Sequence, residues 1–219
     1  MGQHNMNKKN IYYTVGIVGT LAFCFFVWGL FLFMPNKRSV AVDLGSLHGT
    51  WLKSPRTLSD FSFKTTQNET FTPQNAKGHW TFVFFGYTHC PYLCPTTLKM
   101  LSTFYTKLEQ DKITPLPQVL LVTLDPKRDS IHALKKYVHS FNPDFLAARG
   151  TSKTIQAFTK EMGIAYMRLQ SPNADPNTYQ IEHSGTVMLL NPEAQLAAFF
   201  TLPQDPLWIA DDYERVLKS

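Results

Sequence analysis

Apolar residues along this chain alternate between continuous runs and helical spacing. The run from Trp80 to Phe85 predicts a buried strand, and the largely apolar run from Val119 to Leu124 predicts a central parallel strand covered on both faces. Between these runs, apolar residues recur every three or four positions and predict a helix over 95–109, beginning at Pro95. A strand, a helix and a second buried strand in this order indicate an α/β fold.

The same alternation continues on both sides of this unit. Helices are predicted from Asp129 to Phe141, from Thr151 to Gly163, and near the C-terminus. Shorter strands or hairpins are predicted at 61–72, 145–148, 164–169 and 186–200. This order is that of a thioredoxin-like fold, with a central mixed sheet flanked by helices and an added N-terminal hairpin.

The N-terminus carries a different pattern. Ile11 to Met34 is a stretch of 24 residues without a charged side chain. As a helix it would span about 36 Å, enough to cross a hydrocarbon core of about 30 Å with some tilt. A cleaved signal peptide is the alternative, but no small-residue cleavage signal follows the stretch. We therefore expect a tail (1–10), a single transmembrane helix (11–34), a linker (35–57) and one folded domain (58–219).

Composition narrows the function classes. With 44% hydrophobic residues the chain can bury one good core. The formal net charge of +5 includes Lys8 and Lys9 ahead of the apolar stretch, and the remaining charge is too mild and dispersed to indicate nucleic acid binding. Three cysteines do not form a disulfide framework. Cys24 falls within the predicted transmembrane helix, and we expect it to act there only as a small apolar side chain.

The other two cysteines, Cys90 and Cys94, fall between the first buried strand and its following helix. Such a loop lies at the carboxyl edge of the sheet, where α/β proteins place their sites. A helix N-terminus also favours thiolate over thiol. The four-residue separation lets both sulfurs reach one point, as a disulfide or as two ligands of one soft metal ion. A buried structural pair, a redox dithiol and a metal site all remain open at this stage.

His183 lies between the polar segment Gln170–Gln180, expected to be a long mobile loop, and the predicted strand 186–190. In a thioredoxin-like sheet this position is beside the cysteine loop, although an ordinary polar histidine is equally compatible with the sequence. Two thiolates and one imidazole suit copper, above all Cu(I), whereas zinc would need a fourth ligand or water. His89 adjoins Cys90 and is an alternative ligand, but we expect its side chain to point away.

A third motif, Asp125-Pro-Lys-Arg-Asp129, follows the central strand. In the simpler interpretation, Pro126 ends the strand and Asp129 caps the next helix. In the functional interpretation, Asp125 lies at the carboxyl edge near the cysteines, where it orients a partner or tunes a ligand. Both interpretations remain open.

With these three motifs in order, residues 58–217 and the N-terminal apolar stretch resemble the Sco (SenC/PrrC) family. The resemblance implies a membrane-tethered thioredoxin-like domain that faces the periplasm, or the intermembrane space of mitochondria. It implies that copper, as Cu(I) or Cu(II), is bound by Cys90, Cys94 and His183, and it gives Asp125 the role of a tuning or docking residue.

The resemblance also implies a role in assembling cytochrome c oxidase. The family delivers copper to the subunit that carries the CuA centre, or reduces the cysteines of that centre, and other copper chaperones and thioredoxin-like reductants are implied as further partners. We therefore expect a chaperone rather than an enzyme. The alternatives are a thiol–disulfide reductase, in which Cys90 attacks and Cys94 resolves, and a redox or copper sensor. Two positions depart from the family pattern: Tyr92 and Glu182 replace an acidic residue and an aspartate, respectively.

Overall fold

The computed structural model describes residues 43–170, 175 and 178–218, together with Gly19, Leu21, Phe25, Phe26, Trp28 and Gly29. The chain divides into two compact units, Met1–Val40 and Ala41–Ser219. In the first unit, the six described residues are helical, and the rings of Phe25 and Trp28 stack with centroids 6.4 Å apart. Among the helices of the described part, none has the length and apolar character needed to cross a membrane. Most of the predicted transmembrane helix (11–34) falls outside the described residues.

The second unit is built on an eight-stranded mixed sheet. Across the sheet the strands are β1 (Thr50–Arg56), β10 (Leu196–Phe200), β9 (Val187–Leu190), β4 (Thr81–Gly86), β5 (Gln118–Thr123), β6 (Leu146–Arg149), β2 (Phe63–Thr65) and β3 (Thr70–Phe71). The central three, β4, β5 and β6, run parallel, and every other neighbouring pair is antiparallel. The carboxyl ends of the parallel strands therefore meet at one edge, as the sequence predicted for the cysteine loop.

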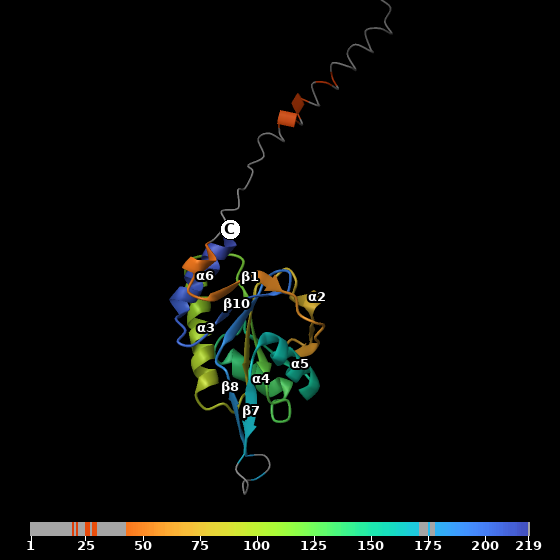
Figure 1. Cartoon of the computed structure of the whole chain (residues 1–219), viewed down its shortest axis with the longest axis vertical. Helices are drawn as coiled ribbons and strands as arrows, with labels where there is room; N and C mark the ends of the chain where they lie inside the picture. Colours follow the sequence, from red (N-terminus) through yellow and green to blue (C-terminus); the bar gives the residue numbers. More distant parts are fainter. Residues whose placement is uncertain are drawn as a thin grey trace, which may run out of the picture. The chain divides into compact units, whose positions relative to one another are not determined.

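Helices cover both faces of the sheet. The step from β4 to β5 and then to β6 runs in one direction, so right-handed crossovers place α3 (Leu93–Gln110) and α4 (Ile131–His139) on the same face. Figure 1 shows α6 (Pro206–Leu217) beside α3 and α5 (Ser152–Met162) on the opposite side of the sheet. The short helix α2 (Pro73–Ala76) and a 3-10 turn, η1 (Leu44–Ser46), complete the elements.

Aromatic side chains fill the core on each side of β4. Because successive side chains of a strand point to opposite faces, Phe82 and Phe85 enter different layers. The ring of Phe82 lies 4.8 Å from Phe104 of α3, and the ring of Phe85 lies 5.7 Å from Phe158 of α5. Both strand residues are fully buried, so β4 is held from above and below.

Most of the predicted elements are confirmed. Thr151 caps α5 by accepting a hydrogen bond from the backbone N–H of Thr154, and Gly163 ends that helix with a left-handed φ of 71°. The N-terminal hairpin forms as β2–β3 and extends the sheet beyond β6, and the C-terminal hairpin forms as β9–β10.

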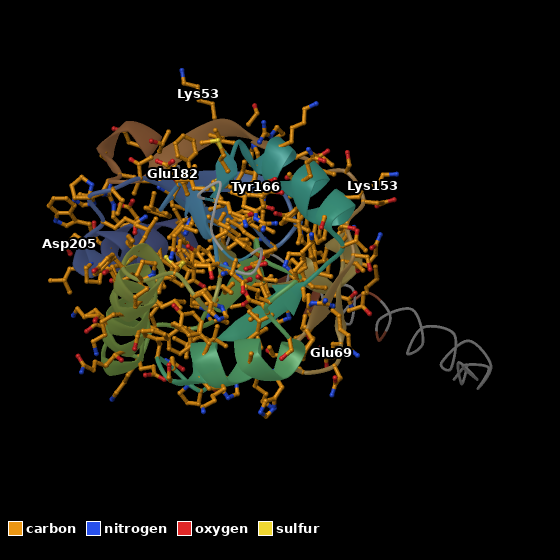
Figure 2. All side chains as sticks on the ribbon, turned by 90° about the horizontal axis from the view of Figure 1, so that it is seen from below. Lys53, Glu69, Lys153, Tyr166, Glu182 and Asp205 are labelled. Atoms are coloured by element: carbon orange, nitrogen blue, oxygen red, sulfur yellow. The ribbon has the colours of Figure 1, made fainter. Side chains whose placement is uncertain are left out.

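The predicted linker was wrong over residues 50–56, which form strand β1. This strand pairs only with β10, at the outer edge of the sheet, and most of its side chains are exposed. An edge strand needs little apolar alternation and tolerates Pro55 because its outer backbone groups face solvent. Lys53 of this strand extends outward from the domain in Figure 2, as do Glu69 and Lys153.

The predicted loop Gln170–Gln180 was followed by an element that the sequence did not indicate. Gln180–His183 forms β8, which pairs antiparallel with β7 (Tyr166–Leu169) in a separate two-stranded sheet. We call β7 and β8 the arm, and Figure 1 shows it extending past the end of the main sheet. Residues 171–174 and 176–177 of the expected loop lie outside the described residues.

The packing under α5 predicts how much one of its aromatic side chains contributes to stability. The ring of Phe158 is buried and lies 4.6 Å from Phe61 and 5.1 Å from Phe63. We expect Phe158→Ala to lower the free energy of unfolding by about 3–5 kcal/mol, because it removes a large ring from a packed site. Urea unfolding followed by circular dichroism measures this. Lys153→Ala, on the exposed side of the same helix, should change stability by less than about 0.5 kcal/mol, and equal effects of the two changes would contradict the packing.

Candidate metal centre

The two cysteines lie where strand β4 gives way to helix α3. The helix begins at Leu93, earlier than predicted, so Cys94 lies in its first turn and is completely buried, while Cys90 in the preceding loop is half-buried. Gly86 ends β4 directly below the sulfur. A Cβ at this position would lie 2.7 Å from Sγ of Cys94, so only glycine leaves room for the thiol.

The structure brings His183 to both sulfurs. Its Nε2 lies 3.4 Å from Sγ of Cys94 and 3.8 Å from Sγ of Cys90, and the three atoms all lie within 4.8 Å of one another. Both cysteines are free thiols. The approach of the imidazole to the cysteines, which the sequence left at even odds, is therefore present in the fold.

The orientation of the imidazole leaves Nε2, the nitrogen that faces the sulfurs, available as a ligand. Nδ1 of His183 lies 3.0 Å from the carbonyl oxygen of Ser184. A carbonyl only accepts hydrogen bonds, so Nδ1 carries the proton and Nε2 keeps its lone pair toward the sulfurs. The rings of Phe84 and Tyr87 contact the imidazole edge-on, with centroids 6.1 and 5.9 Å away, and restrict its rotation.

The two thiols differ in their electrostatics. The hydrogen bond from the Cys94 thiol, helped by that from the Cys94 backbone N–H (3.3 Å), lowers the pKa of Cys90 to about 4 despite partial burial. The same thiol–thiolate hydrogen bond, together with burial, raises the pKa of Cys94 well above its ordinary value. Cys90 therefore carries the first negative charge of the pair, as a thiolate beside a helix N-terminus.

Asp129 holds the cysteine loop in place. The expectation that it caps α4 was wrong: Ser130 is the cap and accepts from the N–H of Ala133 at 3.1 Å. Asp129 is buried instead, and its carboxylate accepts hydrogen bonds from the backbone N–H of Thr88 (3.2 Å) and from the hydroxyls of Thr88 and Thr123. A buried carboxylate requires such donors, so it ties the loop after β4 to the end of β5.

Asp125 is also buried, with only 2% of its surface exposed. Its carboxylate is paired with the guanidinium of Arg128 and accepts a hydrogen bond from the hydroxyl of Tyr179 at 2.6 Å. A carboxylate enclosed in this way faces the interior of the protein, and a role of Asp125 in tuning or docking stays a prediction.

The alternative ligand His89 points away from the sulfurs, as expected. Its Nδ1 lies 3.0 Å from Oγ1 of Thr88 and 3.8 Å from Asp129, and over half of its side chain is exposed. Sequence reasoning missed Tyr87, whose hydroxyl accepts from the N–H of Ile181 (3.1 Å) and donates to Gln180 (2.8 Å). No spacing signal marks this tyrosine, because its partners come from the distant arm.

The two departures from the family pattern lie outside the donor set. Tyr92, between the cysteines, is 81% exposed, and Glu182 is exposed on β8. Neither side chain contributes to the group formed by the thiols and the imidazole.

A second group of potential ligands, His48, Asp211 and Asp212, serves the fold. The buried carboxylate of Asp212 accepts from the backbone N–H groups of His48 (2.9 Å) and Gly49 (2.7 Å) and lies 3.0 Å from Nδ1 of His48. These bonds fasten the start of the domain to α6.

A family model described as SCO1/SenC matches residues 51–218. The chain belongs to the SCO1/SenC family. Among its relatives, a SCO2-like protein of Rickettsia prowazekii is 33% identical over 142 residues, which is 65% of this chain and 68% of the relative. The family resemblance that the three sequence motifs indicated is thereby confirmed.

Solved structures of Sco proteins share the fold of this SCO1/SenC chain. Yeast Sco1 with copper bound matches with a TM-score of 0.68 at 28% identity, over 75% of this chain and 90% of the other. BsSco, described as a member of the Sco family of cytochrome c oxidase assembly proteins, matches in fold with a TM-score of 0.55 at 18% identity, over 75% and 97%. The thioredoxin-like α/β class predicted from the order of elements is confirmed.

The donor set of this SCO1/SenC chain fits a soft metal ion. Two sulfurs and one imidazole nitrogen converge, and within the described part of the chain no fourth His, Cys, Asp or Glu atom joins them. Cu(I) accepts such low-coordinate thiolate and imidazole sets, whereas a closed zinc site requires four protein ligands.

The thiol electrostatics predict a distinct pH profile for alkylation of the metal-free protein. Because the pKa of Cys90 is lowered to about 4, its reaction with iodoacetamide should vary little between about pH 5.5 and 8, whereas an ordinary cysteine, with a pKa of about 8.5, speeds up throughout this range. Cys94 should react far more slowly. Peptide mapping by mass spectrometry measures both rates.

Cys94→Ala removes the donor to the Cys90 sulfur, so the pKa of Cys90 should rise and restore a steep pH dependence. A steep profile in the unsubstituted protein would contradict the assigned thiolate.

Proposed function

We propose that this chain is a membrane-anchored copper chaperone that carries copper on Cys90, Cys94 and His183 for assembly of the CuA centre of cytochrome c oxidase. The single observation that carries this proposal is the convergence of one imidazole nitrogen on two free thiols. Copper bound to a solved family member of the same fold and the description of BsSco as an assembly factor support the cargo and the destination.

The proposed site would accept and hold the ion through unequal contributions of its three residues. Cys90 is already a thiolate and half-buried, so it meets the incoming ion first. Cys94 loses its proton on binding, because only the thiolate is a ligand. His183 supplies a neutral nitrogen that its Nδ1 hydrogen bond holds in position.

Copper uptake by ligand variants tests the proposal. We expect the protein to bind one Cu(I) under reducing conditions, and His183→Ala to weaken binding by about 10–100-fold, by analogy with the cost of losing a supporting group at a metal site. Cys94→Ala should abolish tight binding, because one thiolate and one imidazole remain.

The matched control is His89→Ala, which removes a neighbouring imidazole that faces Asp129 instead of the sulfurs. Competition against a colorimetric Cu(I) chelator measures each affinity. Equal affinities of the protein and its His183→Ala variant would contradict the three-donor site.

The anchor belongs to this proposal as well. The uncharged stretch 11–34 is long enough to span a bilayer, and its placement ahead of the folded unit would tether that unit on the periplasmic or intermembrane-space side, where CuA centres are assembled.

A deletion tests the anchor. We expect the full chain to sediment with membranes and to resist extraction with sodium carbonate, whereas a chain without residues 1–42 should appear in the soluble fraction. Immunoblotting of the two fractions measures this, and recovery of the full chain in the soluble fraction would exclude the anchor.

The asymmetry of the thiols favours one second candidate function, a thiol–disulfide reductase. The Cys90 thiolate would attack a target disulfide and form a mixed disulfide, releasing one target thiolate. Cys94 would then lose its proton, attack the sulfur of Cys90 and release the second target thiol, so that the pair ends as a disulfide. In this function either cysteine substitution abolishes turnover, whereas His183→Ala has only a mild effect. The two functions therefore differ in the cost of losing the imidazole, which is large for copper binding and small for disulfide reduction.

A further inference from the structure

His183 is attached to the protein differently from the two cysteines. The cysteines follow β4, which has strand neighbours on both sides, whereas His183 ends β8, which pairs only with β7. An isolated two-stranded sheet is marginally stable in water. Side-chain contacts must therefore supply much of what holds the arm, and with it the imidazole, against the rest of the domain.

One group of these contacts is concentrated on Tyr179, directly before β8. Its buried hydroxyl donates to Asp125 at 2.6 Å, and its carbonyl accepts from Nη1 of Arg128 at 3.0 Å. The guanidinium of Arg128 also lies over its ring, 3.6 Å from the centroid. Asp125 and Arg128 belong to the segment between β5 and α4, so these contacts join the arm to the fixed part of the domain.

The arm contributes a second cation to the same ring. The guanidinium of Arg168, on β7, lies 3.7 Å from the centroid of Tyr179. Arg168 is paired with Ile181, and the next residue on its face of β7, Tyr166, is paired with His183. One face of the arm therefore carries the Arg168–Tyr179 cation–π contact, the two cross-strand pairs and the imidazole of His183.

We propose that Tyr179 is a positioning residue for His183: clamped by Asp125, Arg128 and Arg168, it fixes the arm so that the imidazole stays on the two thiols. This rests on the proposed function, because it assigns the clamp a role in copper retention. Tyr179 directly precedes β8 and His183 ends it, about 13 Å away at ~3.3 Å per residue, so the clamp acts through the strand and not by contact with the metal.

The clamp makes the imidazole a ligand that depends on the position of the arm, whereas the two thiols do not depend on it. With the arm seated, copper has three donors. With the arm released, the thiols remain in place because Asp129 holds their loop independently of Tyr179. The clamp therefore governs how fast copper leaves, while the thiols govern whether it binds.

The test compares copper release from the full-length protein and two clamp variants. Tyr179→Phe removes the hydroxyl that bonds Asp125 and keeps the ring, and Arg168→Met removes an exposed cation from the arm. The matched control is Lys136→Met, which removes an exposed cation from α4. We expect Cu(I) transfer to an excess of chelator to become faster in both clamp variants and to be unchanged in the control. In Tyr179→Phe the increase should be about tenfold, a typical cost of losing a supporting hydrogen bond at a metal site.

A double-mutant cycle separates positioning from general destabilisation. In a His183→Ala background the imidazole is absent, so Tyr179→Phe should have no further effect on copper release. A tenfold effect that persists in this background would overturn the proposal, because it would act through something other than His183. Equal release from the unsubstituted protein and Tyr179→Phe would overturn it as well.

Hydrogen exchange of the metal-free protein provides a second readout. Tyr179→Phe should accelerate exchange of the β7 and β8 amides about tenfold and leave those of β4 and β5 unchanged. If the unsubstituted protein takes up no copper, the proposed function fails, and this exchange measurement alone decides the clamp. Unchanged exchange in the arm would then reject it.

Discussion

Burial of the Asp129 carboxylate beneath the cysteine loop is the constraint on which the rest of the site depends. Its partners are the backbone and hydroxyl of Thr88 and the hydroxyl of Thr123, so one charged group binds the ends of two neighbouring parallel strands. An unpaired carboxylate at this depth would be very costly. The loop therefore cannot move away without leaving the buried carboxylate of Asp129 without hydrogen-bond donors. Cys90 and the first turn of α3 thus keep their places relative to the sheet.

The metal centre then combines two parts of unequal rigidity. The sulfurs are held by backbone that packs in the core on both faces, with Gly86 leaving room for the buried thiol. The imidazole comes from a separate two-stranded sheet whose contacts to the domain include the hydrogen bonds of the Tyr87 and Tyr179 hydroxyls. This division would suit the proposed copper chaperone, which has to hold an ion and also release it.

Particular residues show which strands and helices could be predicted from the sequence. The continuous apolar run of β4 and the helical spacing after Pro95 predicted the strand, the loop and the helix, because buried parallel strands and amphipathic helices leave strong patterns. Strand β1 was missed because an exposed edge strand leaves almost none. Strand β8 was missed because its single buried residue, Ile181, is too little to form a pattern.

The same limit applies to the site. The grouping of Cys90, Cys94 and His183 could be predicted because metal-ligating residue types are few and the three motifs occur in the order typical of the family. The buried roles of Asp129 and Tyr179 were not readable, because a carboxylate before a helix fits a cap equally well. Tyr179 acquires its role only from partners brought together by the fold.

The unequal burial of the two sulfurs has a consequence for the direction of exchange. Cys94 is sealed beneath the surface, while Cys90 lies in the half-open loop beside the exposed ring of Tyr92. An incoming ligand can therefore reach an ion held at this site from the side of Cys90 or His183, but not from that of Cys94. In a transfer that begins at the surface, the buried sulfur of Cys94 would be the last ligand to be exchanged.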